Sequence, residues 1–387
     1  MKYLAVLGRL SDISLAELTA QFGESVKKIA PNLAVFESNK TININRFGGT
    51  LKFGKLISEN PVDYLLNLNT SDGAFSGKFV IGVSDYSKGA RKFKSQGEAL
   101  KIKKILARQG RSARVLQNND AALSTATSHH NQMGEKDGHV EFLKVGKEWY
   151  VLIGVQNITA YKNRDQARPA RDAKVGMLPP KLAQILINLC GPLPEGSRIL
   201  DPFCGTGVVL QEALLDGYTA YGTDLSDRMI EYSEKNLEWL TEKENSSFAV
   251  AQGPATAKNL FLLSVGDATN FSWDKKIDAV ACETYLGAPM SQPPVELKLK
   301  EQKQECKSII LGFLKNISGQ IDSRTPLALA VPAWLRPNGH YERLNILDEI
   351  KDMGYNVLKL NHLSQEDMLY FREGQIVARE IIVLRKR

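Results

Sequence analysis

Hydrophobic and polar positions divide the chain into two parts with different patterns. Up to residue 157, short apolar runs alternate with loops and a few amphipathic stretches, which is typical of α+β structure. The expected strands are Tyr3–Leu7, Ala34–Phe36, Leu51–Ile57, Lys78–Val83, Ala113–Leu116, Val140–Val145 and Trp149–Val155. Helices are expected from Ser14, where Glu17 completes a capping box, and over Gly97–Gln109 and Ala121–His130.

Strands and helices alternate regularly after a predicted linker, Asn157–Gly176. The expected strands are Arg198–Leu200, Ala220–Thr223, Asp278–Ala281 and Leu327–Val331, and the expected helices are Pro180–Cys190, Gly207–Leu215, Asp227–Leu240, Gln304–Ile317 and Tyr341–Met353. This alternation predicts a parallel sheet covered by helices on both faces. Met368–Phe371 and Val377–Leu384 predict a closing antiparallel hairpin, and Ser246–Lys258 predicts a polar loop.

Composition narrows the class of protein. The chain has 387 residues, of which 43% are hydrophobic and 24% charged, which excludes a disordered or fibrous protein. No apolar run reaches the roughly 18 residues of a membrane span, and the apolar stretch before Arg9 is too short for a signal peptide. The four cysteines and five histidines lack disulfide or metal-site spacing. We therefore expect a cytoplasmic protein without a metal, and we favour a monomer.

Positive charge is concentrated in one stretch. The net charge is +7, yet Lys78–Arg114 alone holds 11 basic residues against Asp85 and Glu98. Such a surface attracts polyphosphate and predicts RNA binding, although a solvated helix face is the alternative. The candidate RNA contacts here are Lys88, Arg91, Lys92, Lys94, Lys101, Lys104, Arg108, Arg111 and Arg114. Arg164 and Arg168 are further candidates, unless they form salt bridges within the linker.

A glycine-rich turn carries the strongest chemical signal. The expected strand Arg198–Leu200 runs into Asp201-Pro202-Phe203-Cys204-Gly205-Thr206-Gly207, where the glycines allow close approach of a ligand. Asp224 ends the next strand, where an acid accepts hydrogen bonds from ribose hydroxyls, and Asp267 is placed to meet an adenine amino group. Asp201 would repel a phosphate at this turn, but it suits the ammonium group of S-adenosylmethionine.

These residues, with Gly176–Ala183 upstream and Gly374–Glu380 near the end, resemble the archaeal and eukaryotic tRNA guanosine-10 N2-methyltransferase family. The resemblance implies a ferredoxin-like segment at 1–60, a THUMP RNA-binding domain at 61–157, a linker at 158–176 and a Rossmann-like methyltransferase domain at 177–387. It also implies that the S-adenosylmethionine site is lined by Met177, Pro179, Asp201, Phe203, Cys204, Gly205, Thr206, Gly207, Asp224, Leu225, Asp267 and Ala268.

The fourth strand departs from that family. Its Asp-Pro-Pro-Tyr motif is replaced by Glu283-Thr284-Tyr285, which we take as the catalytic candidates. A carboxylate can accept the adjacent N1–H and N2–H of guanine, or a guanidinium, but it pairs poorly with adenine. Tyr285 either stacks on the base or packs in the core, and Glu283 either aligns the substrate or forms a structural ion pair.

The leading hypothesis is an S-adenosylmethionine-dependent tRNA methyltransferase that acts on the N2 amino group of a guanosine. The alternatives are methylation of another RNA base or of a protein arginine, and an RNA-binding protein without turnover. Methylation of a pyrimidine by a thiolate would need an activated cysteine, and the setting of Cys282 does not suggest one.

Overall fold

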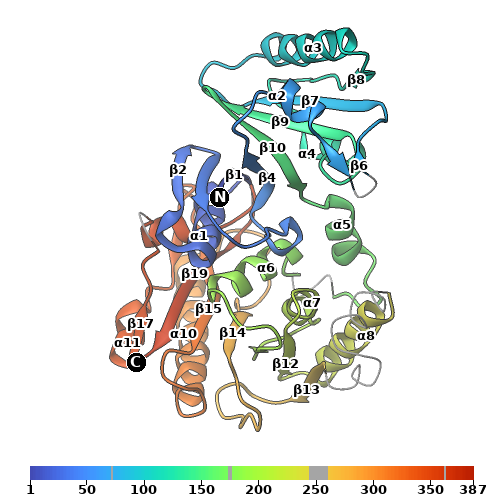
Figure 1. The fold of residues 1–387 in the computed structure, drawn as a ribbon. Coiled ribbons are helices and arrows are strands. Elements are labelled where there is room, and N and C mark those ends of the chain that lie inside the picture. The colour runs from blue at the N-terminus through green and yellow to red at the C-terminus, as the bar shows by residue number, and fades with distance from the viewer. Residues whose placement is uncertain (71–72, 173–176, 244–259, 361–362) are drawn as a thin grey trace. The chain divides into compact units, whose positions relative to one another are not determined.

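The computed structural model describes residues 1–70, 73–172, 177–243, 260–360 and 363–387 (Figure 1). The chain divides into two compact units: unit 1 is Met1–Ser11 with Phe22–Ala160, and unit 2 is Asp12–Gln21 with Tyr161–Arg387. The predicted boundaries at residues 60, 157 and 176 stay predictions. The expected loop Ser246–Lys258 lies outside the described residues, as does Gly176.

Unit 1 is built on one mixed sheet in the order β2-β3-β1-β4-β10-β9-β7-β8. Its strands are β1 (Lys2–Leu7), β2 (Lys27–Ala30), β3 (Leu33–Glu37), β4 (Thr50–Leu56), β7 (Phe79–Asp85), β8 (Ala113–Val115), β9 (His139–Val145) and β10 (Glu148–Val155). A separate small hairpin joins β5 (Asn69–Thr70) and β6 (Gly73–Ala74). Strand β7 runs parallel to β8 and β9, whereas the other described pairs in this sheet are antiparallel.

The helices of unit 1 are α2 (Pro61–Leu66), α3 (Lys92–Arg108) and α4 (Thr125–His130), with short 3₁₀ turns η1 (Gly23–Ser25) and η2 (Ile44–Arg46). Helix α3 buries Ala99, Ile102 and Leu106 against Phe79 and Ile81 of β7. These positions recur at helical spacing, so the lysines and arginines between them face solvent.

Unit 2 contains a sheet in the order β13-β12-β11-β14-β15-β19-β17. Its strands are β11 (Arg198–Asp201), β12 (Thr219–Asp224), β13 (Phe261–Val265), β14 (Ala279–Glu283), β15 (Pro326–Leu335), β17 (Tyr355–Val357) and β19 (Val377–Lys386). The first five in this order are parallel, and β19 is antiparallel to β15 and β17. This topology confirms the predicted Rossmann-like fold with a closing antiparallel strand pair, in which β18 (Leu369–Tyr370) joins β19.

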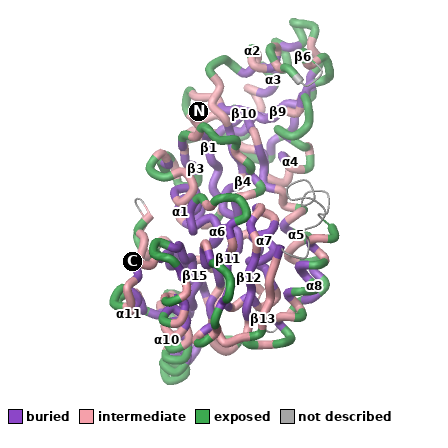
Figure 2. The backbone as a smooth tube through the Cα atoms, turned by 60° about the horizontal axis from the view of Figure 1, so that its bottom comes forward, coloured by how far each residue is buried: buried purple, intermediate pink, exposed green. Residues whose placement is uncertain are grey.

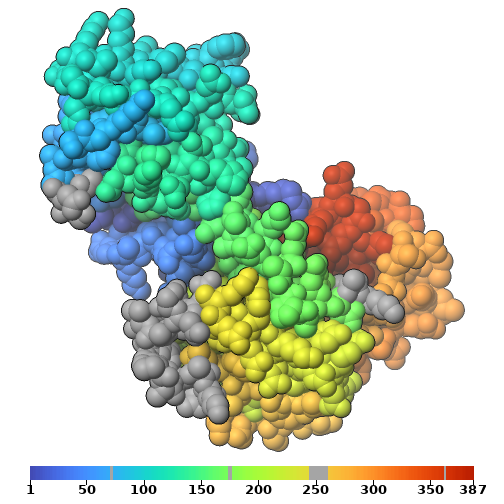
Figure 3. All heavy atoms as spheres, turned by 90° about the vertical axis from the view of Figure 1, so that its right-hand side faces the viewer, coloured from blue at the N-terminus to red at the C-terminus, as the bar shows by residue number. Residues whose placement is uncertain are grey.

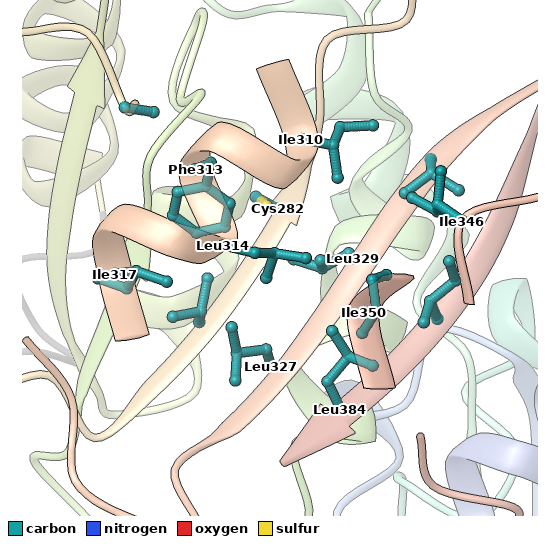
Figure 4. Close-up of a cluster of buried hydrophobic side chains, with 14 of the residues drawn as sticks. Cys282, Ile310, Phe313, Leu314, Ile317, Leu327, Leu329, Ile346, Ile350 and Leu384 are labelled. Carbon is teal, nitrogen blue, oxygen red and sulfur yellow. The ribbon is translucent and has the colours of Figure 1, made fainter. Parts of the chain in front are cut away.

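Several helices lie wholly or mostly in unit 2. They are α1 (Ser11–Phe22), α5 (Ile158–Gln166), α6 (Pro180–Leu189), α7 (Val208–Leu215), α8 (Asp227–Lys243), α10 (Glu296–Ser318) and α11 (Leu347–Asp352), with the 3₁₀ turn η4 (Gln365–Met368). Phe313 and Leu314 of α10 pack toward Leu327 and Leu329 of β15 and Cys282 of β14 (Figure 4). The strands of both units lie mostly in buried segments (Figure 2).

Several predicted elements are wrong in extent. The expected helix Tyr341–Met353 begins as a strand, β16 (Tyr341–Arg343), because these residues pair with the end of β15, and only α11 is helical. The expected linker contains the helix α5. Ser14 does not begin a helix but is buried inside α1. The helix expected over Ala121–His130 is α4, which starts after Ser124, whose side chain caps it.

Candidate active site

Acidic residues end neighbouring parallel strands of unit 2. Asp201 ends β11, Asp224 ends β12 and Glu283 ends β14, while Asp267 follows β13 after one further residue. Strand β11 pairs with both β12 and β14, so the chain changes lateral direction between β11 and β14. Ligands of open α/β sheets bind at this switch point, beside the carboxyl ends of the strands.

The glycine-rich turn connects β11 to α7 at this edge. Gly205 and Gly207 have φ values of +51° and +78°, which side-chain-bearing residues rarely adopt. The carboxylate of Asp224 accepts a hydrogen bond from the Gly205 N–H at 2.9 Å, and the Cys204 N–H donates to the Thr223 carbonyl at 2.9 Å. The turn is therefore fixed to the end of β12.

Two residues of α8 that the sequence reasoning missed hold the same turn from the other side. The Ser233 hydroxyl donates to the Gly205 carbonyl at 2.8 Å, and the Asn236 amide donates to the Thr206 carbonyl at 2.9 Å. Both side chains are fully buried. Polar residues on the buried face of an amphipathic helix are the signal that would have revealed them, because a buried polar group needs a partner.

The acidic side chains at this edge of the sheet affect the pKa of Asp201. Asp201 is 3% exposed, and its Oδ1 accepts a hydrogen bond from the Phe203 N–H at 3.0 Å. Burial raises the pKa of Asp201 well above its ordinary value, and the charges of Asp224 and Glu283 raise it further. Burial also raises the pKa of Asp224, against the hydrogen bonds from the Ser226 and Gly205 N–H groups. A cation bound here would relieve the crowding of negative charge.

Glu283 forms an ion pair, which was the alternative raised from the sequence, but its partner is Arg379, which the sequence did not identify. Its Oε1 accepts a hydrogen bond from Nε of Arg379 on β19 at 2.7 Å, and the two side chains are 15% and 7% exposed. Within the described part of the chain, no donor is bound to Oε2 of Glu283. The charged Arg379-Glu380 pair interrupts the apolar strand β19, which is the sequence signal for such a partner.

The residues next to Glu283 pack or form hydrogen bonds within the protein. Thr284 is buried, and its hydroxyl donates to the Ala330 carbonyl at 3.2 Å. The Tyr285 ring packs against the core of unit 2, and its hydroxyl donates to Glu305 at 3.3 Å. Cys282 lies in that core (Figure 4), where burial raises the pKa of its thiol well above the usual range. This placement argues against a Cys282 thiolate nucleophile.

The other predicted cofactor residues lie in different surroundings. Oδ1 of Asp267 accepts hydrogen bonds from the Thr269 N–H and hydroxyl at 2.9 and 2.8 Å, and Leu225 is 75% exposed. Phe203 makes an edge contact with Phe313 at 5.5 Å between ring centroids. Cys204, Ala268 and Pro179 are buried, and Met177 is half-buried. In the described residues, no group of three or more side chains is arranged to hold a metal ion.

The predicted RNA-contacting residues fall into two sets. In unit 1, the residues Lys88, Arg91, Lys92, Lys94, Lys101, Lys104, Arg108 and Arg114 are exposed, on and around α3, while Arg111 is half-buried and donates to the Phe75 carbonyl. This region is the turquoise surface in Figure 3.

In unit 2, Arg164 pairs with the buried Glu212 at 2.7 Å, and Arg168 is 3% exposed. Neither placement suits a contact with a phosphate in solvent. The alternative of a salt bridge holds for Arg164, whose partner lies in α7, whereas Arg168 forms no ion pair with a described carboxylate.

Comparisons with known proteins agree with this geometry. Residues 168–291 match the family model described as "RMKL-like, methyltransferase domain". A tRNA (guanine(10)-N2)-dimethyltransferase of Methanothermobacter thermautotrophicus is 28% identical over 188 residues, which are 48% of this chain and 48% of that protein. The enzyme of that name from Pyrococcus abyssi is 33% identical over 119 residues, 30% of each chain. The chain thus matches about half, or less, of the length of these relatives.

Among solved structures, TrmN from Thermus thermophilus aligns over 100% of both chains, with a TM-score of 0.44 and 18% identity. No helix among the described residues is long and apolar enough to cross a membrane. The parallel sheet with β19 inserted antiparallel and the acid-lined switch point agree with the family model, and residues 168–291 are similar to an RMKL-like methyltransferase domain.

Proposed function

We propose that this chain is an S-adenosylmethionine-dependent tRNA methyltransferase that methylates the exocyclic N2 amino group of a guanosine. The observation that carries the proposal is the convergence of Asp201, Asp224 and Glu283 at the switch point of the sheet. The two relatives support the substrate class, since both are named tRNA (guanine(10)-N2)-dimethyltransferase.

The turn fits the cofactor. A Cβ atom on Gly205 would meet no atom closer than the Phe203 carbonyl at 3.9 Å, so the space beside this backbone is open. Asp201 would bind the ammonium group, Asp224 the ribose hydroxyls and Asp267 the adenine amino group, while Leu225 offers an exposed apolar surface to the ring. When bound, S-adenosylmethionine supplies a methyl group on a positively charged sulfur.

Glu283 is proposed to align the acceptor. Its Oε1 is held by Arg379, which fixes the carboxylate and leaves Oε2 to accept a hydrogen bond from the guanine N2 amino group. Holding the amine in line with the methyl group requires orientation more than a strong base, because proximity and alignment supply much of such rate enhancements. Removing the Glu283 carboxylate should therefore lower the rate of methyl transfer more than it lowers the affinity for the cofactor.

The proposed partner is tRNA, bound through the exposed basic residues on and around α3. Contacts to phosphate supply affinity without reading sequence, so this surface would dock the RNA while the pocket selects the base. The target base would have to be turned out of its stack to reach the strand ends. We further propose action in the cytoplasm as a monomer, a state that sedimentation would check.

Purified protein incubated with methyl-labelled S-adenosylmethionine and unmodified total tRNA tests this proposal. Label in the RNA supports a tRNA methyltransferase. Label that appears only in added protein would favour the arginine alternative, in which Glu283 binds a guanidinium of the substrate. Cofactor and tRNA binding without any transfer would point to an RNA-binding protein that has lost turnover.

A further inference from the structure

Arg168 occupies a position that the sequence pattern did not explain. It is 3% exposed, and the comparably buried arginine among the described residues, Arg379, is neutralised by Glu283. Arg168 has no such partner, because no described carboxylate forms an ion pair with it. Burial lowers the pKa of its guanidinium, while the negative charges of Asp165 and Glu212 act in the opposite direction. Glu212 is itself paired with Arg164.

The contacts that Arg168 does make are weak. Its Nη1 lies 3.5 Å from the hydroxyl of Thr206, and its Nη2 lies 3.3 Å from the sulfur of Met177. A thioether is a poor acceptor, and the buried Nε has no hydrogen-bond partner within the described residues. Leaving a buried charged donor unsatisfied is costly, so Arg168 is suited to bind an anion.

The structure holds this side chain beside the glycine-rich turn. Two residues further on, the Ala170 N–H donates to the Asn236 amide oxygen at 3.0 Å, and the Asn236 amide nitrogen donates to the Ala170 carbonyl at 2.9 Å. The same Asn236 nitrogen donates to the carbonyl of Thr206. One buried side chain thus fixes both the segment that carries Arg168 and the turn that its guanidinium contacts.

The turn is therefore flanked by opposite charges, with Asp201 at its start and Arg168 against Thr206 near its end. A ligand with a free amino-acid end carries an ammonium and a carboxylate. Asp201 could bind the ammonium and Arg168 the carboxylate. A guanidinium is well matched to a carboxylate, because its planar fork can donate two hydrogen bonds to the two oxygens. A phosphate of RNA is a poorer candidate, because the side chain is almost fully buried.

We propose that Arg168 binds the carboxylate of the amino-acid end of the cofactor, so that Arg168 and Asp201 together recognise a zwitterion. This inference rests on the proposed use of S-adenosylmethionine. It assigns to the cofactor site a residue whose charge had suggested contact with RNA.

Isothermal titration calorimetry with two ligands tests the proposal without measuring turnover. The ligands are S-adenosylmethionine and decarboxylated S-adenosylmethionine, which keeps the sulfonium and the ammonium but lacks the carboxylate. In Arg168→Met, S-adenosylmethionine should bind about 10- to 100-fold more weakly, and the decarboxylated ligand should be affected less than about 2-fold. Arg171→Met is the matched control, since Arg171 is exposed and should leave both affinities unchanged.

The outcomes are distinguishable. Equal weakening of both ligands in Arg168→Met would show a structural role and overturn the proposal, as would no change in either. If Arg168→Met fails to fold, the neutral variant Arg168→Gln replaces it, and an unchanged preference for the carboxylated ligand would also overturn the proposal. Failure of the wild-type protein to bind either ligand would instead refute the proposed function.

Discussion

Replacing Glu283 should lower both the stability of the protein and the rate of methyl transfer. The ion pair with Arg379 determines how much stability is lost. In Glu283→Ala, the guanidinium of Arg379, whose side chain is 7% exposed, loses its carboxylate. Removing one partner of a buried pair costs about 3 to 5 kcal/mol, and we take about 3 kcal/mol because Glu283 is partly exposed. For a unit of this size, about 3 kcal/mol lowers Tm by roughly 6 to 12 °C.

The catalytic effect should appear beside this loss of stability. Without the carboxylate that aligns the acceptor amine, the rate should fall by about 10²-fold or more, or roughly 3 kcal/mol in the barrier. Affinity for S-adenosylmethionine should change little. Scanning calorimetry measures Tm, and initial rates of methyl transfer are compared at a temperature where every variant is folded.

The double variant Glu283→Ala with Arg379→Met separates the two effects. It removes both charges, so most of the lost stability should return while the rate stays low. A Tm for Glu283→Ala equal to that of the wild type would refute the energetic reasoning. Wild-type activity in the double variant would refute the role of Glu283 in alignment.

Three further predictions concern the glycine-rich turn and the helix α3. The pKa of Asp201 is raised in the free protein, and a bound ammonium favours the ionised carboxylate. Cofactor affinity should therefore rise with pH until the pH exceeds that pKa. Asp201→Asn should bind the cofactor weakly, and its affinity measured by calorimetry should no longer depend on pH in this way. Gly207→Ala would place a Cβ atom 3.0 Å from the Ser233 hydroxyl, on a residue whose φ is +78°. This backbone strain costs about 1–2 kcal/mol. The cofactor affinity measured by calorimetry should therefore weaken about 10-fold or more. Lys101→Gln with Lys104→Gln should weaken tRNA binding in filter assays and reduce the slope of log affinity against log salt by about 1 to 2, with unchanged cofactor affinity; a slope equal to the wild type's would contradict RNA contact at α3.

Local features of the sequence were sufficient for much of the fold. The glycine-rich turn and the acids that end β11, β12 and β14 follow from strand, turn and helix signals within a few residues of each other. The prediction of one helix over Tyr341–Met353 was wrong because its first three residues form a hairpin with the end of β15, and three residues are too few to show strand alternation. The helix α5 was missed for another reason, since it is short and mostly polar and its pattern resembles a linker.

Site residues were harder to predict when their roles depend on burial. Residue type marked Arg168 as a candidate for RNA contact, yet Asn236 anchors the backbone of Ala170, two residues further on, and the Arg168 side chain is buried beside the turn. Arg379 lies 96 positions from Glu283 in the sequence, so only the antiparallel insertion of β19 beside β15 brings them together. Charge can be read from a sequence, whereas the partner of a buried charge depends on tertiary structure.

The identity of the methylated nucleoside tests the central claim most directly. After reaction with unmodified tRNA and labelled S-adenosylmethionine, the RNA is digested to nucleosides and separated by mass spectrometry. We expect label in N2-methylguanosine or its dimethylated form, and loss of that product in Glu283→Ala. Label in another nucleoside, with Glu283→Ala retaining full activity, would contradict the assignment of Glu283 to the guanine amino group.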